Sequence, residues 1–105
     1  MTTIAVLTTI DSLDHAQVIA RTLVERKLAA CVQISTVESI YLWQGAMQND
    51  QEFRLTIKTT AERYPNVEAT IRELHTYDLP AIYAFGTTQV FEPYAEWVAE
   101  HSAGD

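Results

Sequence analysis

The spacing of apolar residues changes several times along this chain between two periods, and these changes constrain the fold more than any other feature. Residues 4–9 form a strand-length run whose two faces are both largely apolar, as expected for a central strand, whereas residues 16–24 carry apolar side chains every three or four positions, as a helix does. Two further strands are predicted at residues 29–43 and 52–59, the first broken by the polar residues 35–36. A second helix is predicted to end near residue 74, before a fourth strand at residues 81–86.

The predicted order is therefore strand, helix, strand, strand, helix and strand, with Pro93 opening a short C-terminal helix. This is the order of an α+β, ferredoxin-like fold, a split βαβ arrangement in which helices cover one face of an antiparallel sheet. We expect the last helix to turn Tyr94, Trp97 and Val98 inward. Because no segment resembles a linker, we predict a single domain over residues 1–105.

The long hairpin arm expected in the middle of the chain has large apolar side chains on both faces. Ile40 and Leu42 point one way from the predicted strand, and Tyr41 and Trp43 point the other way. The helices of one small domain cover only one face of the sheet, so the second face of the arm must be buried elsewhere. We expect another subunit to bury it; the alternative is that the C-terminal helix folds back over the arm through Trp97.

Charge and composition exclude several classes of partner. The formal net charge is -7, and the seven basic residues are scattered, so there is no basic stripe for DNA, RNA or an anionic membrane. No apolar run approaches the ~20 residues of a membrane span. A single cysteine cannot form an internal disulfide, and the first residues do not resemble a secretory signal. These features predict a cytoplasmic location.

Sequence signatures of catalysis are missing. With three glycines the chain has no glycine-rich phosphate loop, and it has no nucleophile elbow or His-Glu-x-x-His pattern. We therefore predict a binding protein rather than an enzyme, with no cofactor required for folding. Cys31 is interpreted either as a small buried side chain or as a metal ligand. Lys58 is interpreted either as the partner of an anion or as a solvent-exposed side chain.

The segment 73–80 is the stretch most typical of a functional site, because it places an imidazole, a phenol and a carboxylate in a turn that ends in proline. His75 and Asp78 are close enough in sequence to share a cation, and an imidazole with a carboxylate suits copper, zinc or nickel. The alternative is structural: His75 caps the helix end, and Tyr77 and Asp78 tie the loop by hydrogen bonds.

Three stretches carry a family pattern in order along the chain. They are residues 28–32 (LAACV), residues 39–45 (SIYLWQG) continuing to 57–59 (IKT), and residues 73–80 (ELHTYDLP), with Tyr94 and Trp97 behind them. Together they resemble the CutA divalent-cation tolerance family. The resemblance implies a homotrimer similar in build to PII-type signalling trimers, with a link to copper or similar divalent metal ions. It also implies functional positions at Cys31, Trp43, Lys58, His75, Tyr77, Asp78 and Trp97.

Two functions are compatible with these features. The first is a homotrimer that binds copper or another divalent metal ion through Cys31, His75 and Asp78 and contributes to the metal-ion response. The second is a PII-like signalling or adaptor trimer that holds a small anionic ligand between subunits. In that case Lys58 supplies the counter-charge, and Trp43, Tyr77 and Trp97 line the pocket. A stable scaffold with adventitious metal affinity is a third interpretation.

Overall fold

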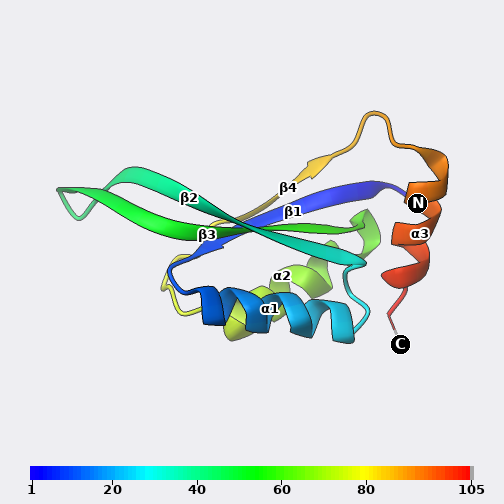
Figure 1. Ribbon diagram of the computed structural model, residues 1–105, viewed down its shortest axis with the longest axis horizontal. Coiled ribbons are helices and arrows are strands. Elements are labelled where there is room, and N and C mark those ends of the chain that lie inside the picture. Colours follow the sequence, from blue (N-terminus) through cyan, green and yellow to red (C-terminus); the bar gives the residue numbers. More distant parts are fainter. Residues whose placement is uncertain (105) are drawn as a thin grey trace.

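The computed structural model describes residues 1–104 and confirms the α+β architecture (Figure 1). The elements are β1 (Thr3–Ile10), α1 (Leu13–Glu25), β2 (Cys31–Trp43), β3 (Ala46–Thr60), the 3₁₀ turn η1 (Ala61–Arg63), α2 (Tyr64–Leu74), β4 (Ile82–Gly86) and α3 (Glu92–His101). The four strands form one antiparallel sheet in the order β2-β3-β1-β4, with α1 and α2 together on one face (Figure 1). Within residues 1–104, no helix is long and apolar enough to cross a membrane.

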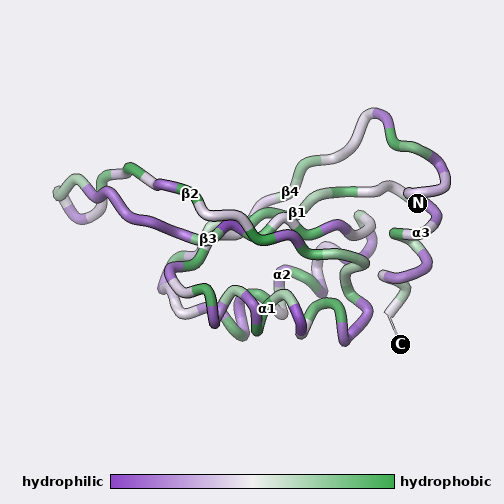
Figure 2. The backbone as a smooth tube through the Cα atoms, viewed as in Figure 1, coloured by the Kyte–Doolittle hydropathy of each residue, from purple (hydrophilic) through white to green (hydrophobic). Residues whose placement is uncertain are grey.

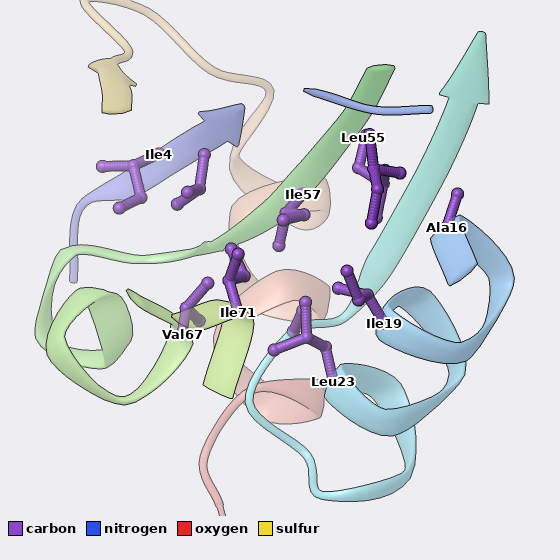
Figure 3. Close-up of a cluster of buried hydrophobic side chains, with 11 residues drawn as sticks. Ile4, Ala16, Ile19, Leu23, Leu55, Ile57, Val67 and Ile71 are labelled. Carbon is purple, nitrogen blue, oxygen red and sulfur yellow. The ribbon is translucent and has the colours of Figure 1, made fainter. Parts of the chain in front are cut away.

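The hydrophobic core lies between the sheet and the two helices (Figure 3). Every second residue of β1 and β3 points toward the helices, which accounts for the alternation of Phe53, Leu55 and Ile57 with polar residues in β3. The strands contribute Ile4, Val6, Ile10, Leu55 and Ile57, and the helices contribute Ala16, Ile19, Leu23, Val67 and Ile71. The opposite face of the sheet is left open by α1 and α2.

The hairpin formed by β2 and β3 is longer than predicted. β2 runs without a break through residues 35–36, and β3 begins at Ala46 rather than at Glu52. The predicted break was wrong because cross-strand backbone pairing continues through polar residues, whose side chains lie in solvent at the edge of the sheet. The hairpin therefore extends beyond the region that the helices cover.

A two-residue turn closes the hairpin. Gln44 and Gly45 have φ angles of +50° and +80°, the left-handed values that match the twist of the flanking strands. Trp43 is therefore paired with Ala46, and the pairing continues without interruption to Cys31 at the far end of β2. Because residues directly opposite one another share a face of the sheet, this turn determines the face on which every arm side chain lies.

The C-terminal helix lies at the opposite end of the molecule from the hairpin turn (Figure 1). Val98 is buried as predicted, but Tyr94 and Trp97 are 37% and 40% exposed, so the prediction that they face inward was wrong. Their rings instead stack on each other along the outside of α3, with centroids 5.9 Å apart. Because α3 packs on the far ends of β1 and β3, the alternative in which it covers the arm was also wrong.

The arm exposes apolar side chains on both faces, as predicted. Ile40 and Leu42 are each 66% exposed and Met47 is 71% exposed, and on the other face Tyr41 and Trp43 remain exposed. Figure 2 shows hydrophobic stretches that extend along β2 to the tip, far from the helices. Exposed apolar residues concentrated in this way are typical of surfaces that contact another molecule.

The hydroxyl of Thr8 provides a test of the core packing. Thr8 is buried on β1, and within residues 1–104 its Oγ1 has no hydrogen-bond partner. Thr8→Val removes this unsatisfied group at nearly constant volume, so we expect a gain of about 1 kcal/mol in the free energy of unfolding, measured with urea at fixed protein concentration. Thr59→Val is the control, because the buried Thr59 hydroxyl donates to Leu28 O at 2.7 Å, and its loss should destabilise the protein. A destabilised Thr8→Val variant would contradict this account of the core.

Candidate functional site

A cleft of about 630 Å³ lies along the hairpin arm, from the end of β1 and the loop between α2 and β4 to Trp43, the last residue of β2 before the hairpin turn. Its size is within the roughly 300–1,000 Å³ of small-molecule sites. The lining residues come from four parts of the chain: Thr9, Asp11, Tyr41, Trp43, Asp50, Gln51, Glu52, Tyr77, Asp78, Leu79 and Ala81. Two of the predicted ligand-binding residues, Trp43 and Tyr77, and one predicted metal ligand, Asp78, are among them.

The hairpin register places the strand side chains of this cleft on one face. Tyr41 and Trp43 alternate along β2, and Asp50 and Glu52 alternate along β3 on the same face, away from α1 and α2. Thr9 lies on that face of β1. The cleft is therefore built on the open face of the sheet, and the loop after α2 closes one side of it.

Two tyrosines donate hydrogen bonds to two of the cleft's carboxylates. The Tyr77 hydroxyl donates to Glu52 Oε2 at 2.7 Å, and the Tyr41 hydroxyl donates to Asp50 Oδ2 at 2.6 Å. The hydrogen bond to Asp50, with smaller contributions from burial and nearby carboxylates, raises the pKa of Tyr41 to about 12. Burial and then the bond to Glu52 raise the pKa of Tyr77 well above its usual value. Both phenols therefore stay protonated and act as donors at neutral pH.

His75 holds the loop rather than facing the cleft. It is the C-cap of α2, and its Nε2 lies 2.8 Å from Thr9 O. Its Nδ1 accepts the Tyr77 backbone N–H at 3.1 Å, which makes Nε2 the protonated nitrogen that donates to Thr9. The ring also packs edge-on against the Tyr77 ring, with centroids 4.7 Å apart. Both ring nitrogens of His75 are therefore engaged in hydrogen bonds within the chain. These contacts agree with the interpretation of His75 as a residue that caps the helix end.

The cleft is strongly acidic. Four carboxylates line it, those of Asp11, Asp50, Glu52 and Asp78, and none of its lining residues within 1–104 is basic. The nearest basic residue along β3 is Arg54, which is on the same face as Glu52 but is exposed and outside the lining. Low-dielectric walls lined by charge of one sign raise the local concentration of ions of the opposite sign. The cleft therefore attracts cations.

Three other predicted site residues, Cys31, Lys58 and Trp97, lie toward the opposite end of the sheet. Cys31 is half-buried and is paired with Lys58 across the hairpin. The Lys58 ammonium donates to Gln33 Oε1 at 2.5 Å. Six residues of extended strand separate Lys58 from Glu52, a distance of roughly 20 Å, about twice the ~8–10 Å over which salt screens exposed charges. Lys58 therefore does not supply a counter-charge to the cleft of its own chain.

Trp97 belongs to an aromatic row on the surface of α3. Its ring stacks with Tyr94 and lies 4.9 Å from the His101 ring. Burial, and secondarily the negative charge that Cys31 carries when ionised, raise the pKa of Tyr94. Trp97 thus lies on the outside of α3, whereas Trp43 and Tyr77 line the cleft.

A single chain does not assemble the predicted metal ligands into one coordination sphere. Among the described residues 1–104, no three His, Cys, Asp or Glu side chains lie close enough together to hold a metal ion. Asp78 lines the cleft, His75 uses both ring nitrogens in hydrogen bonds, and Cys31 lies at the far end of β2. These residues do not fit one metal ion within one subunit.

Sequence reasoning missed Asp11, Asp50, Glu52 and the polar role of Tyr41. The signal that could have found three of them is the turn at residues 44–45. A two-residue turn there pairs Trp43 with Ala46, and this register places Tyr41, Asp50 and Glu52 on one face of the hairpin. Asp11 directly follows β1, and it lines the cleft only because the loop after α2 lies beside it. The sequence carries no comparable signal for the path of that loop.

The Tyr41–Asp50 hydrogen bond predicts a distinctive alkaline titration. A folded pKa of about 12 lies above the ordinary 10.0, so the bond contributes stability below pH 10, and this contribution is lost as the pH rises toward 12. Asp50→Asn should move one tyrosine titration step, followed by absorbance at 295 nm, down toward pH 10. Tyr41→Phe should remove that step. Titration of Tyr41 near pH 10 in the unmodified protein would contradict the hydrogen bond.

The contacts of His75 predict a structural role that can be measured. His75→Ala removes the donor to Thr9 O and the acceptor of the Tyr77 N–H, and we expect a loss of about 2 kcal/mol in the free energy of unfolding. His15→Ala is the matched control, because His15 is an exposed residue of α1, and it should change stability by less than about 0.5 kcal/mol. Equal stabilities of the two variants in urea would show that His75 does not hold the loop.

Comparison with known proteins agrees with this fold and gives the family. The family model for the CutA1 divalent ion tolerance protein matches residues 4–101. The divalent-cation tolerance protein CutA of Thermus thermophilus is 40% identical over 98 residues, which are 92% of this chain and 95% of that protein.

Solved structures agree equally well. The T. thermophilus structure superposes with a TM-score of 0.91 at 39% identity and covers 95% of this chain and 98% of its own. A structure from Archaeoglobus fulgidus, described as a periplasmic divalent cation tolerance protein CutA, has a TM-score of 0.93 at 31% identity with the same coverage. From its matched residues, its fold and these relatives, the chain belongs to the CutA1 divalent ion tolerance family.

Proposed function

We propose that this protein acts in divalent-cation tolerance as a homotrimer that binds copper or a similar divalent metal ion, without catalysing a reaction. The observation that carries this proposal is the uncovered hairpin arm. Ile40, Leu42 and Met47 are 66–71% exposed, beyond the reach of the helices of their own chain. At roughly 25 cal/mol per Å² of apolar surface removed from water, covering both faces of the arm stabilises an assembly substantially.

Copies of the same chain are the simplest cover for the arm. Most soluble oligomers are closed assemblies of identical subunits, and an arm with two apolar faces can contact more than one neighbour. A trimeric, PII-like arrangement has this property. Such an assembly also brings residues from different subunits close together, which matters because one chain keeps the predicted metal ligands apart.

A metal site in this assembly would draw on more than one subunit. Cys31 is a soft ligand suited to Cu(I), and Asp78 is a hard carboxylate in an acidic cleft. His75 joins such a site only by giving up the hydrogen bond to Thr9 or the one to Tyr77. The overall charge of -7 favours cations in general.

The alternative of a PII-like adaptor for a small anion gains no support from the cleft. An anion bound between Trp43 and Tyr77 would face four carboxylates, and Lys58 lies roughly 20 Å away along the strand. An anion pocket would have to form near Lys58 itself, from residues of neighbouring subunits.

A cytoplasmic location remains our prediction, although the A. fulgidus relative is described as periplasmic.

Native mass spectrometry of the intact protein, titrated with copper and zinc, tests both parts of the proposal. We expect a trimer that takes up a whole number of copper ions per subunit. Asp78→Asn and Cys31→Ser should each reduce copper uptake without changing the trimer, because they remove ligands and leave the arm unchanged. Glu92→Gln is the charge-matched control, since Glu92 is exposed at the start of α3 and should leave uptake unchanged.

The possible outcomes separate the two parts. A monomer at micromolar concentration would refute the burial argument for the arm. A trimer whose copper adducts are irregular in number and equal in all variants would refute the metal site and favour a scaffold with adventitious affinity.

A second test of the trimer is Leu42→Glu, which places a charge on the exposed arm and should shift the measured mass toward that of the monomer.

A further inference from the structure

We infer that α3 is a cover that opens as a unit separate from the rest of the fold, and that a strap formed by residues 102–104 holds it closed through Arg63. The strap joins the end of α3 to the turn that follows α1 and to the turn that precedes α2. This device goes beyond the metal binding proposed above and does not depend on it. It bears on function because Trp97, one of the positions that the family resemblance implies, lies on α3.

The helix α3 has little stability of its own. It has ten residues, and Phe91 at its N-cap has no polar side chain to bond the free N–H groups of the first turn. Of its residues, all of which the structure describes, only Val98 is buried. A helix this short is marginal in water without tertiary packing. Contacts with other parts of the chain must therefore hold α3 in place.

The sheet surface under α3 is polar. The helix packs on β1 and β3, and Figure 1 shows it beside the start of β1. Thr3 and Thr60 are paired at this end of the sheet, and because Ile4 points to the core, both threonines point to the open face. Both are buried, and α3 is the element that covers them. Within residues 1–104, the Thr3 Oγ1 has no hydrogen-bond partner, which disfavours the closed position of the helix.

The strap supplies the strongest contacts that hold α3 closed. The Arg63 side chain donates through Nε to Ser102 O at 2.9 Å and through Nη2 to Ala103 O. The Gly104 N–H donates to Lys27 O at 2.9 Å. The last carbonyls of a helix have no partner within the helix, and hydrogen bonds from a charged donor are stronger than neutral ones. Arg63 therefore caps the end of α3 from a distant part of the sequence.

The strap closes in one defined geometry. Gly104 has a φ angle of +77°, a left-handed conformation that glycine adopts most readily. A Cβ at this position would lie 3.2 Å from the Arg63 Cζ, so the close approach also favours glycine. Lys27 is left-handed as well, with φ of +55°, and its carbonyl accepts the Gly104 N–H. Both ends of this hydrogen bond thus depend on special backbone conformations.

The other end of α3 is joined to the sheet by an exposed loop. The Thr87 Oγ1 donates to Thr3 O at 2.8 Å, which fixes the start of the loop to β1. Residues 88–91 are all exposed. Segments with few buried contacts open at a lower free energy than the core. Release of the strap therefore frees α3 to turn on this loop, together with Trp97, while the pairing of β1 with β4 stays intact.

The test is native-state hydrogen exchange of the intact protein, followed by ¹H–¹⁵N NMR. The amides of residues 96–101 report on α3, and those of residues 5–8 in β1 report on the core. We expect the α3 amides to exchange faster than the β1 amides. Arg63→Gln should speed exchange in α3 at least about tenfold, because it removes the charged donor of two hydrogen bonds, and should leave the β1 amides unchanged.

Three further variants make the test specific. Arg72→Gln is the matched control, an exposed residue of α2 whose loss changes the net charge by the same amount, and it should leave α3 exchange unchanged. Gly104→Ala should speed α3 exchange at least about threefold, and it keeps the test valid if Arg63→Gln folds poorly. Thr3→Val should slow α3 exchange about threefold, because it removes the unsatisfied hydroxyl under the closed helix.

Three results would overturn the inference. Equal acceleration of the α3 and β1 amides in Arg63→Gln would show that α3 opens only when the whole fold opens. Equal α3 rates in Arg63→Gln and Arg72→Gln would show that the strap does not hold the helix. Acceleration of the α3 amides in Leu42→Glu, which disturbs the proposed contact between subunits, but not in Arg63→Gln would show that a neighbouring subunit holds α3 instead.

Discussion

The register of the β2–β3 hairpin is the constraint on which the rest of the structure depends. The left-handed turn at Gln44–Gly45 fixes it, and a slip by one residue would move every hairpin side chain to the opposite face of the sheet. With the observed register, Leu55 and Ile57 enter the core against the helices, while Asp50 and Glu52 lie on the open face. One local conformation thus determines both the hydrophobic core and the polarity of the cleft.

A chain of contacts then joins the hairpin to the rest of the fold. Thr9 at the end of β1 accepts from His75, His75 accepts from the Tyr77 backbone, and the Tyr77 hydroxyl reaches Glu52 on β3. These bonds link β1, the end of α2, the following loop and β3. The loop is therefore held by polar contacts at an edge where the apolar core does not reach.

The fold could be predicted from the sequence because it depends on periodicity, which is a local property. The order of elements and the exposed arm both follow from patterns among neighbouring residues. The candidate site could be predicted only in part. Trp43, Tyr77 and Asp78 line one cleft, whereas Lys58 lies farther along β3 and Trp97 lies on α3. Glu52 was missed because its burial depends on a loop that arrives from 25 positions farther along the chain.

The arm and the cleft share two residues, and this links assembly to ligand binding. Tyr41 and Trp43 belong to the exposed face of the arm and also line the cleft. A molecule that binds in the cleft contacts the same rings that a neighbouring subunit would cover, so the two events cannot be energetically independent. By linkage, whatever a ligand does to the affinity between subunits, assembly does equally to the affinity for the ligand.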